Sequence, residues 1–246
     1  MRRGNRTLVE MVVVGLIASA IGIAIALSIH WFPTAASKQA GPIDTLWDVL
    51  LIVSIPVFVL VATVVLFAVR DFRVRPGQEL QDGAPIHGNT RLEVVWTAVP
   101  AILIASLVVY AYLVLHDIEK APAKEATELQ VTVTGRQFAW RFAYPQAGGK
   151  TVTSLELYVP KGRSVHFNVR SEDVLHDFWV PAWRMKIDAV PGITTGYRVT
   201  PTKLGEYPIV CAELCGLGHA FMRSTAHVLS PAQFAAWVAK QQRSAS

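Results

Sequence analysis

The 246-residue chain has only two cysteines, and charged residues make up just 17% of it. It contains no glycine-rich phosphate loop and no nucleophile elbow, so two common signatures of nucleotide binding and serine hydrolysis are missing. No Cys-x-x-Cys-His motif occurs, which excludes a covalently attached c-type haem. No internal repeat is present. Cysteine chemistry is therefore confined to one short segment, at Cys211 and Cys215.

Charge is scarcest in the first half of the chain, where three apolar runs cover residues 8–32, 46–69 and 94–116. Each run approaches or exceeds the ~20 residues with which a helix crosses a bilayer. Three such runs so close together are a poor match to buried helices of a soluble protein. The sequence therefore predicts a hydrophobic segment and linker at 1–45, a transmembrane helical hairpin at 46–120 and an outer domain at 121–246.

Arginines flank these runs on one side of the predicted membrane. They are Arg2, Arg3, Arg6, Arg70, Arg73, Arg75 and Arg91. The 34–45 loop carries only Lys38 and Asp44. Because positive loops stay in the cytoplasm, residues 117–246 are expected outside. These arginines also contribute much of the net charge of +5, so that charge does not indicate nucleic-acid binding.

The first run has two interpretations. A basic start followed by an apolar stretch is also typical of a secretory signal peptide, and small residues at 35–37 would permit cleavage. The run is longer than a usual signal core, and no Ala-x-Ala site follows it. We therefore expect a third membrane helix, with cleavage left open.

The outer domain has the pattern of a β-sandwich or Greek-key barrel. Residues 129–134 and 164–170 alternate apolar and polar side chains, which is typical of half-buried strands. Phe138, Trp140, Phe142 and Tyr144 place aromatics at every second position, and we expect all four on one face. Turn signals recur between the predicted strands. A short amphipathic helix is expected after Ser230, which is a suitable N-cap.

Soft metal ligands gather between the last two predicted strands. The segment contains Cys211, Cys215, His219 and Met222, and His176 lies upstream. Thiolate, thioether and imidazole donors together favour copper. A disulfide, a zinc site and buried core thiols are the alternatives. Met222 argues against zinc, which has little use for a thioether.

These residues resemble subunit II of the haem–copper cytochrome c oxidases. His176 followed by Cys211-x3-Cys215-x3-His219-x2-Met222 is similar to that family's copper A signature. Two further stretches are similar to family motifs: LEVVWTAVPA at 92–101, and the 172–192 segment around the first histidine. The resemblance extends from residue 46 to the C-terminus. It implies a membrane-anchored all-β protein, in which transmembrane helices precede a cupredoxin-like domain.

The resemblance also assigns roles. It implies a dinuclear copper A centre with ligands His176, Cys211, Cys215, His219, Met222 and the backbone carbonyl of Glu213, the two cysteines bridging the coppers. The Glu213 carboxylate would bind magnesium at the contact with subunit I. An apolar shell would comprise Phe178, Trp179, Trp183 and Phe221. The protein would work with subunit I and other oxidase subunits in a bacterial-type plasma membrane, surrounded by lipid. It would pass electrons from cytochrome c to haem for oxygen reduction and proton pumping.

Three residues are expected to act outside the copper centre. Glu93, at the cytoplasmic start of the third run, would mark a proton path; the alternative is an ordinary acid at a helix end. Phe138 occupies the place of the family's usual electron-accepting tryptophan, and Trp140 is the next aromatic, so either could accept electrons.

Residues 117–246 hold 15 Lys/Arg against 11 Asp/Glu, and 143–153 has no acid. We therefore expect a membrane-bound, complex-associated or acidic cytochrome as donor.

Three other functions compete with this one. A quinol oxidase subunit would lack copper, and the complete ligand set argues against it. A nitric or nitrous oxide reductase would lack the roles expected for Glu93 and Glu213. A copper carrier would need exchangeable copper, whereas so many converging ligands favour retention.

Overall fold

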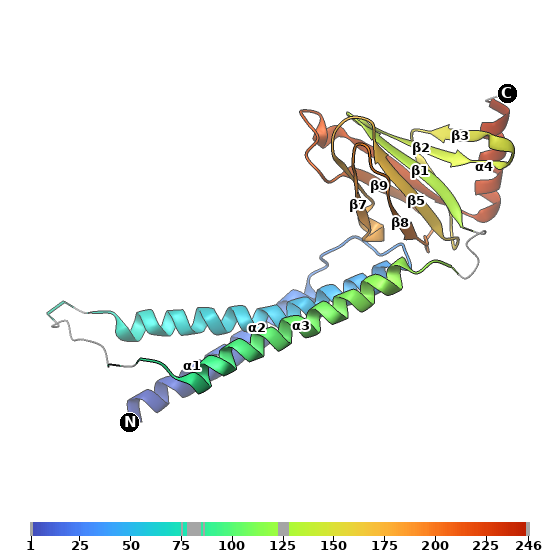
Figure 1. The fold of residues 1–246 in the computed structure, drawn as a ribbon. Helices are drawn as coiled ribbons and strands as arrows, with labels where there is room; N and C mark the ends of the chain where they lie inside the picture. Colours follow the sequence, from blue (N-terminus) through green and yellow to red (C-terminus); the bar gives the residue numbers. More distant parts are fainter. Residues whose placement is uncertain (1, 75, 78–84, 86, 123–127, 245–246) are drawn as a thin grey trace. The chain divides into compact units, whose positions relative to one another are not determined.

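The computed structural model describes residues 2–74, 76–77, 85, 87–122 and 128–244 (Figure 1). Two compact parts are present. A helical unit comprises Met1–His30 and Thr45–Leu113, and a β unit comprises Trp31–Asp44 and Val114–Ser246. Residues 31–44 therefore belong with the β unit, although the sequence placed them with the first apolar segment. Arg75, one of the arginines used to predict the topology, lies outside the described residues.

Three long helices correspond to the three apolar runs. They are α1 (Arg2–Ser28), α2 (Ala40–Phe72) and α3 (Thr90–Glu119). All three are long and apolar enough to cross a membrane. Their large side chains point outward; Phe58, for example, is 74% exposed. An apolar helix surface of this kind is stable in lipid rather than in water, so the prediction of membrane helices is confirmed. The first helix ends at Ser28, short of residue 32.

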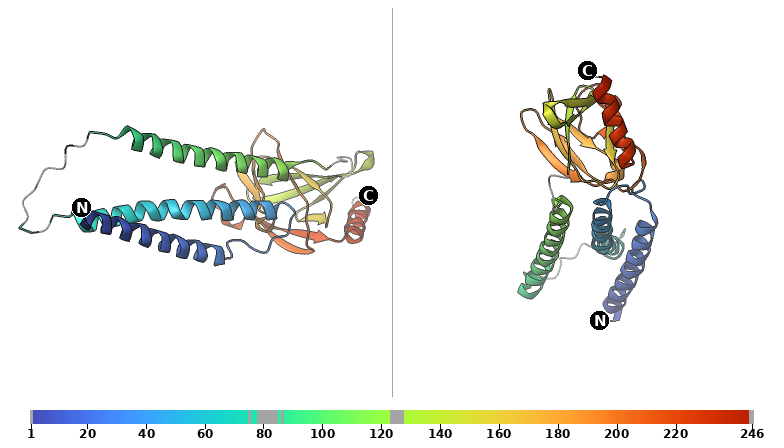
Figure 2. Two further views of the ribbon diagram at one scale, coloured as in Figure 1. Left: turned by 90° about the horizontal axis from the view of Figure 1, so that it is seen from below. Right: turned by 90° about the vertical axis from the view of Figure 1, so that its right-hand side faces the viewer.

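The β unit is a sandwich of two five-stranded sheets (Figure 2). One sheet has the order β3-β2-β1-β5-β8, and the other has the order β4-β10-β9-β6-β7. The strands are β1 (Leu129–Arg136), β2 (Ala139–Pro145), β3 (Thr151–Ser154), β4 (Leu157–Pro160), β5 (Val165–Ser171), β6 (His176–Trp179), β7 (Lys186–Ala189), β8 (Thr195–Val199), β9 (Gly205–Cys211) and β10 (Arg223–Leu229). The pairs β1–β5 and β4–β10 are parallel and the others antiparallel. The expected β-sandwich is confirmed.

Alternation along the strands builds the core. In β2, Trp140, Phe142 and Tyr144 are buried and the residues between them are less so. Period-two burial follows from the pleat, which points successive side chains to opposite faces. Phe138 lies before β2 and is 38% exposed. The expectation that it shares the inner face with the other three aromatics is therefore wrong.

A C-terminal helix, α4 (Pro231–Ser244), closes the β unit, as predicted. Ser230 Oγ accepts a hydrogen bond from the Gln233 backbone N–H (3.3 Å), and Gln233 Oε1 accepts one from the Ser230 N–H (3.0 Å). This reciprocal pair is a capping box, which satisfies donors that the helix itself leaves unpaired. Trp237 then stacks on Tyr158 with ring centroids 4.4 Å apart, so that the helix is held against β4.

The segment Trp31–Asp44, here called the connector, is integrated into the β unit. Ala36 is fully buried; its N–H donates to Ala182 O (2.9 Å), and its carbonyl accepts from the Thr202 N–H (2.8 Å). Ser37 forms a β-bridge with Pro201. The connector thus behaves as a short extra edge strand, and its backbone groups are satisfied by the sandwich.

Arg184 holds the connector in place. Its guanidinium bonds both carboxylate oxygens of Asp44 (2.6 and 3.1 Å), donates to Pro33 O (2.8 Å) and lies 4.7 Å from the Phe32 ring centroid. Phe32 and Pro33 precede the small residues considered as a cleavage position. The β unit therefore uses groups on both sides of that position, and retention of the first segment stays a prediction.

We predict that Arg184→Met destabilises the β unit by about 2–3 kcal/mol, because it leaves Asp44 without its cation and two carbonyls without a donor. The Arg184 side chain is only 4% exposed, whereas Asp44 is 34% exposed, so the loss should fall below that of a fully buried pair. Thermal unfolding of the full chain in detergent, followed by tryptophan fluorescence, measures the change.

The matched control is Arg141→Met. Arg141 is 56% exposed and lies 3.8 Å from Glu172. Such a surface pair contributes about 0–1 kcal/mol, so the control should unfold close to the parent. Equal unfolding temperatures for the two variants would contradict the role given to Arg184.

Candidate metal centre

Two strand ends and one loop carry the expected ligands. His176 is the first residue of β6, and Cys211 is the last residue of β9. The loop from 212 to 222 then carries Cys215, His219 and Met222. The segment from Cys211 to Met222 is called the ligand loop below. The Cys211 N–H donates to Met222 O (3.2 Å), so the first and last residues of the ligand loop face each other across a hairpin. Two rigid strands therefore fix both ends of the loop.

The donor atoms converge. Cys211 Sγ lies 3.9 Å from Cys215 Sγ and 3.9 Å from His176 Nδ1. Cys215 Sγ lies 3.6 Å from His219 Nδ1 and 3.8 Å from Met222 Sδ. The side chains of His176, Cys211 and Cys215 are all buried. Each sulfur therefore faces the other sulfur and one imidazole, which makes the arrangement nearly symmetric.

The backbone carbonyl of Glu213 completes the cluster, because its oxygen lies 3.2 Å from Cys211 Sγ. The Glu213 residue itself is exposed. The separate roles expected for its carbonyl and its carboxylate stay a prediction. Within the described residues, one His/Cys/Asp/Glu group has metal-binding geometry: His176, Cys211 and Cys215.

This donor set fits copper better than the alternatives. A disulfide needs sulfurs about 2.05 Å apart, and both cysteines are free. Met222 is fully buried with its sulfur turned toward Cys215, a soft donor that zinc rarely uses. Burial, and after it the neighbouring Cys211, raise the pKa of the Cys215 thiol to about 11. A bound cation would offset this by favouring the thiolates.

Asp173 orients the first histidine. Its Oδ1 accepts the hydrogen bond from His176 Nε2 (2.8 Å). With its proton on Nε2, the imidazole presents an unprotonated Nδ1 to the cluster, as metal binding requires. Burial alone would raise the pKa of Asp173, but the Gln137 N–H, His176 and the Val174 N–H outweigh it and lower that pKa to about 2. Asp173 is therefore an ionised acceptor at neutral pH.

The turn between β1 and β2 clamps the ligand loop. Gln137 donates its backbone N–H to Asp173 Oδ2 (2.7 Å) and its side-chain Nε2–H to Cys215 O (2.6 Å). The Phe138 ring lies against Gly218, where an added Cβ would come within 2.5 Å of it. A glycine is required at 218 because of this close approach. One turn thus touches both segments that supply ligands.

Trp140 lies behind the first histidine. Its ring centroid is 6.0 Å from that of His176, and the residue is 2% exposed. A donor protein could not touch it directly. Phe138, at 38% exposure, is the member of the pair that reaches the surface.

The expected apolar shell is only partly present. Phe178 and Trp183 are fully buried and Trp179 is half-buried, but Phe221 is 83% exposed. Its inclusion was wrong, because the short helix His219–Phe221 directs it outward. The sequence analysis also missed the roles of Asp173 and Gln137. The position of Asp173 three residues before a ligand histidine was the available signal.

Glu93 belongs to the helical unit and lies in the first turn of α3. Its Oε1 accepts a hydrogen bond from the Asn89 N–H (3.1 Å), while Asn89 Oδ1 accepts one from the Leu92 N–H (3.2 Å). The carboxylate therefore caps its own helix, where negative charge is favourable. Its expected place in a proton path stays a prediction.

Comparisons with known proteins agree with this site. Residues 11–114 match the family model for the cytochrome c oxidase subunit II transmembrane domain, and residues 151–228 match the model for its periplasmic domain. Cytochrome c oxidase subunit 2 of Thermostichus vulcanus is 34% identical over 90% of this chain and 84% of its own length. The protein of the same name from Synechocystis is 30% identical over 89% of this chain and 80% of its own.

Among solved structures, the periplasmic domain of subunit II of cytochrome oxidase from Bradyrhizobium japonicum is 30% identical, with a TM-score of 0.46. The match covers 52% of this chain and 98% of that one. The two matching family models and the length of the curated matches establish the relationship. With three helices long and apolar enough to span a membrane, followed by an extracytoplasmic, cupredoxin-like copper domain, the chain belongs to the cytochrome c oxidase subunit II family.

Proposed function

We propose that this chain accepts electrons from a cytochrome c-type donor at a dinuclear copper A centre. It passes them to haem in subunit I, where oxygen is reduced and protons are pumped. The strongest support is the pairing of each cysteine sulfur with one imidazole, Cys211 with His176 and Cys215 with His219. Two thiolates placed between two imidazoles suit a pair of metal ions better than a single one.

The chain's own residues prepare this site. His176, Cys211, Cys215 and His219 would hold the two copper ions, which would supply one-electron transfer with little reorganisation. Asp173 fixes the tautomer and ring orientation of His176, and Gln137 fixes the loop at Cys215. Phe178 and Trp183 keep water from the inner side. The roles of Met222 and the Glu213 carbonyl as weak ligands are part of the same proposal.

The proposed assembly supplies what this chain lacks. Subunit I would provide the haem, the oxygen chemistry and the remaining ligands of a magnesium ion held by the exposed Glu213 carboxylate. The location would be a bacterial-type plasma membrane. We retain residues 46–120 as the hairpin and 121–246 as the copper domain, with the connector packed on the latter. No activity of this chain alone is proposed.

We propose Phe138 as the position where electrons reach the site. Its ring touches the ligand loop at Gly218 while 38% of the residue stays exposed. The neighbouring surface of the loop is apolar, with Leu214 at 77% and Leu217 at 104% exposure. The ionised Asp173 carboxylate accepts hydrogen bonds from the Gln137 N–H, the Val174 N–H and His176. Docking there should depend on short-range contact more than on long-range charge.

The central test is metal content and absorption of the purified complex. We expect two copper ions per chain and the near-infrared band of copper A, with magnesium present in the same metal analysis. His219→Ala should abolish that band. Haem-bearing subunits should copurify with the chain. One copper per chain, or zinc in its place, would refute the proposed centre.

Glu93→Ala separates the proton path from the copper site in the same complex. We expect slower proton-coupled turnover with an unchanged near-infrared band, because Glu93 lies in α3 and touches no copper ligand in the described chain. Glu10→Ala, which removes another acid of the helical unit with an exposed arginine partner, is the control. Normal turnover of Glu93→Ala would remove Glu93 from the proposed path.

Asp173→Asn should weaken copper binding about 10–100-fold, the usual effect of removing a carboxylate that orients a metal-binding histidine. The asparagine keeps the shape of the side chain, but its neutral amide oxygen accepts the hydrogen bond from His176 Nε2 less strongly than a carboxylate does. Competition with a copper chelator measures affinity, and the absorption band reports distortion of the site. Glu172→Gln, one residue away and 38% exposed, should leave both unchanged. Equal affinities for the two variants would contradict the role of Asp173.

The donor proposal is tested by ionic strength. With a basic soluble cytochrome c, kcat/KM should depend only weakly on salt, because Lys and Arg outnumber Asp and Glu in residues 117–246. Phe138→Leu should lower kcat/KM at every salt concentration, and Leu204→Ala, another exposed apolar residue, should not. A steep loss of rate with salt would show that charge steers the donor after all.

A further inference from the structure

A basic cavity lies in the β unit beside the ends of the membrane-spanning helices. One part has a volume of about 730 Å³ and is lined by Lys38, Arg163, Thr200 and neighbouring residues. An adjoining part of about 400 Å³ shares Lys38 and Thr200 and adds Asp117 and Lys120. The two parts form one recess between the connector, the end of α3 and the turn before β5. The copper proposal assigns no role to this recess.

The charge of this recess is positive. Among the described residues that line it, three side chains are cationic (Lys38, Lys120 and Arg163) and one, Asp117, is anionic. Glu128 is hydrogen-bonded to Ser164 on the wall, but it also pairs with Arg198 (3.1 Å), so it adds little negative field. In the part of the chain that the structure describes, neither Lys38 nor Lys120 has a carboxylate partner within 4.0 Å.

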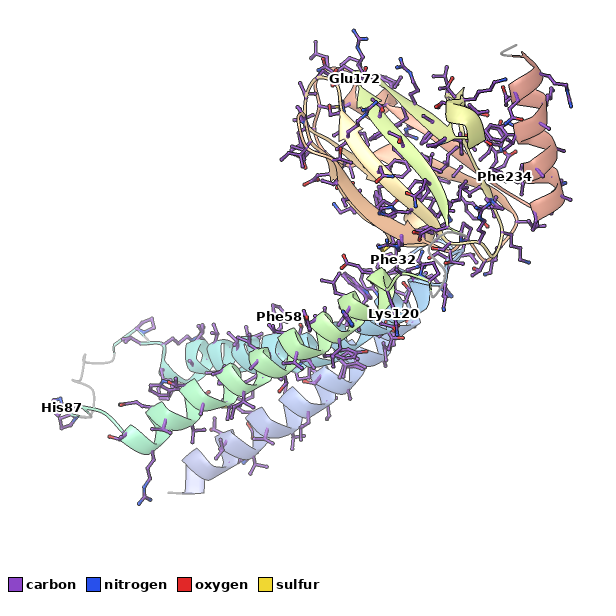
Figure 3. All side chains as sticks on the ribbon, turned by 45° about the vertical axis from the view of Figure 1, so that its right-hand side comes forward. Phe32, Phe58, His87, Lys120, Glu172 and Phe234 are labelled. Atoms are coloured by element: carbon purple, nitrogen blue, oxygen red, sulfur yellow. The ribbon has the colours of Figure 1, made fainter. Side chains whose placement is uncertain are left out.

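The position of these lysines along the chain indicates their level relative to the lipid bilayer. Lys38 lies two residues before α2 begins, and Lys120 directly follows the last residue of α3. The apolar run of α3 ends near Leu115, so Lys120 lies roughly 7 Å further along at 1.5 Å per residue. The headgroup layer adds roughly 5–8 Å to the hydrocarbon on each side. The recess is therefore at the level of lipid phosphates. Figure 3 shows Lys120 and Phe32 at one end of the β unit and Glu172, beside the copper ligands, at the other.

We propose that this recess binds the phosphodiester headgroup of an anionic phospholipid in the outer leaflet. Lys38 and Lys120 supply the charge from two segments that a single headgroup would join, and Arg163 faces it from the turn before β5. Basic groups at a membrane surface attract anionic lipid. A bound lipid would thereby tie the connector to the end of α3. The proposal depends on membrane topology alone, so it stands or fails independently of the copper centre.

Native mass spectrometry of the full chain, released from detergent containing equal phosphatidylglycerol and phosphatidylcholine, tests the site. We expect one phosphatidylglycerol to be retained in preference to phosphatidylcholine. The double variant Lys38→Gln/Lys120→Gln should bind it about 25-fold less tightly, or roughly fivefold per charge. Lys120→Arg keeps the charge and should retain the lipid. Lys150→Gln, outside the recess, should behave as the parent does.

Three results would overturn the proposal: equal retention by the double variant and the parent, equal retention of both lipids, or displacement of the lipid by millimolar inorganic phosphate. The last result would identify a site for free phosphate instead. Because both lysines are exposed, the double variant should fold. An unfolding temperature equal to that of the parent in lipid-free detergent verifies this, and the parent's choice between the two lipids keeps the proposal falsifiable if the double variant unfolds early.

Discussion

The copper site depends on the close approach of the β1–β2 turn to the ligand loop and to the segment that carries Asp173 and His176. Soft and polar donors buried in an apolar sandwich need partners that hold them in one arrangement, because an unpaired polar group there is costly. Three glycines permit the approach: an added Cβ would lie 3.0 Å from His176 at Gly135, 2.9 Å from Gln137 at Gly216 and 2.5 Å from Phe138 at Gly218. Through that contact, Asp173 and Gln137 reach His176 and Cys215. Backbone proximity therefore holds the ligand side chains of the site together.

The connector is also linked to the copper site, through Arg184 and the strands β7 and β6. Arg184 adopts a left-handed backbone conformation (φ 64°), which costs a non-glycine residue about 1–2 kcal/mol. Its ion pair with Asp44 and its bonds to two carbonyls offset that cost. β7, which begins two residues later, pairs with β6, and β6 opens with His176. The chain between the first two membrane helices is thus joined to the strand pair that carries a copper ligand.

Residue type and local spacing determined what the sequence could predict. The period of two revealed β1, β2 and β5, and the soft-ligand spacing revealed the loop from Cys211 to Met222, because both are local patterns. The clamp formed by Gln137 was not predictable in this way, since Gln137 and Cys215 are 78 residues apart. The connector was missed for the same reason: its partners are residues such as Ala182 and Thr202. Phe221 was misplaced because one turn of short helix, invisible in composition, reversed its direction.

The two ends of the β unit carry different surfaces, and this separates their tasks. The ligand loop exposes Leu214, Leu217 and Phe221, whereas the recess near α2 and α3 gathers Lys38, Lys120 and Arg163. Salt screens exposed charges beyond about 8 Å at physiological ionic strength. Lysines at one end of the sandwich therefore add little to the field that a donor meets at the other (Figure 3). We therefore expect the proposed lipid site at one end to act independently of donor docking at the other, where apolar contact at the loop would decide affinity.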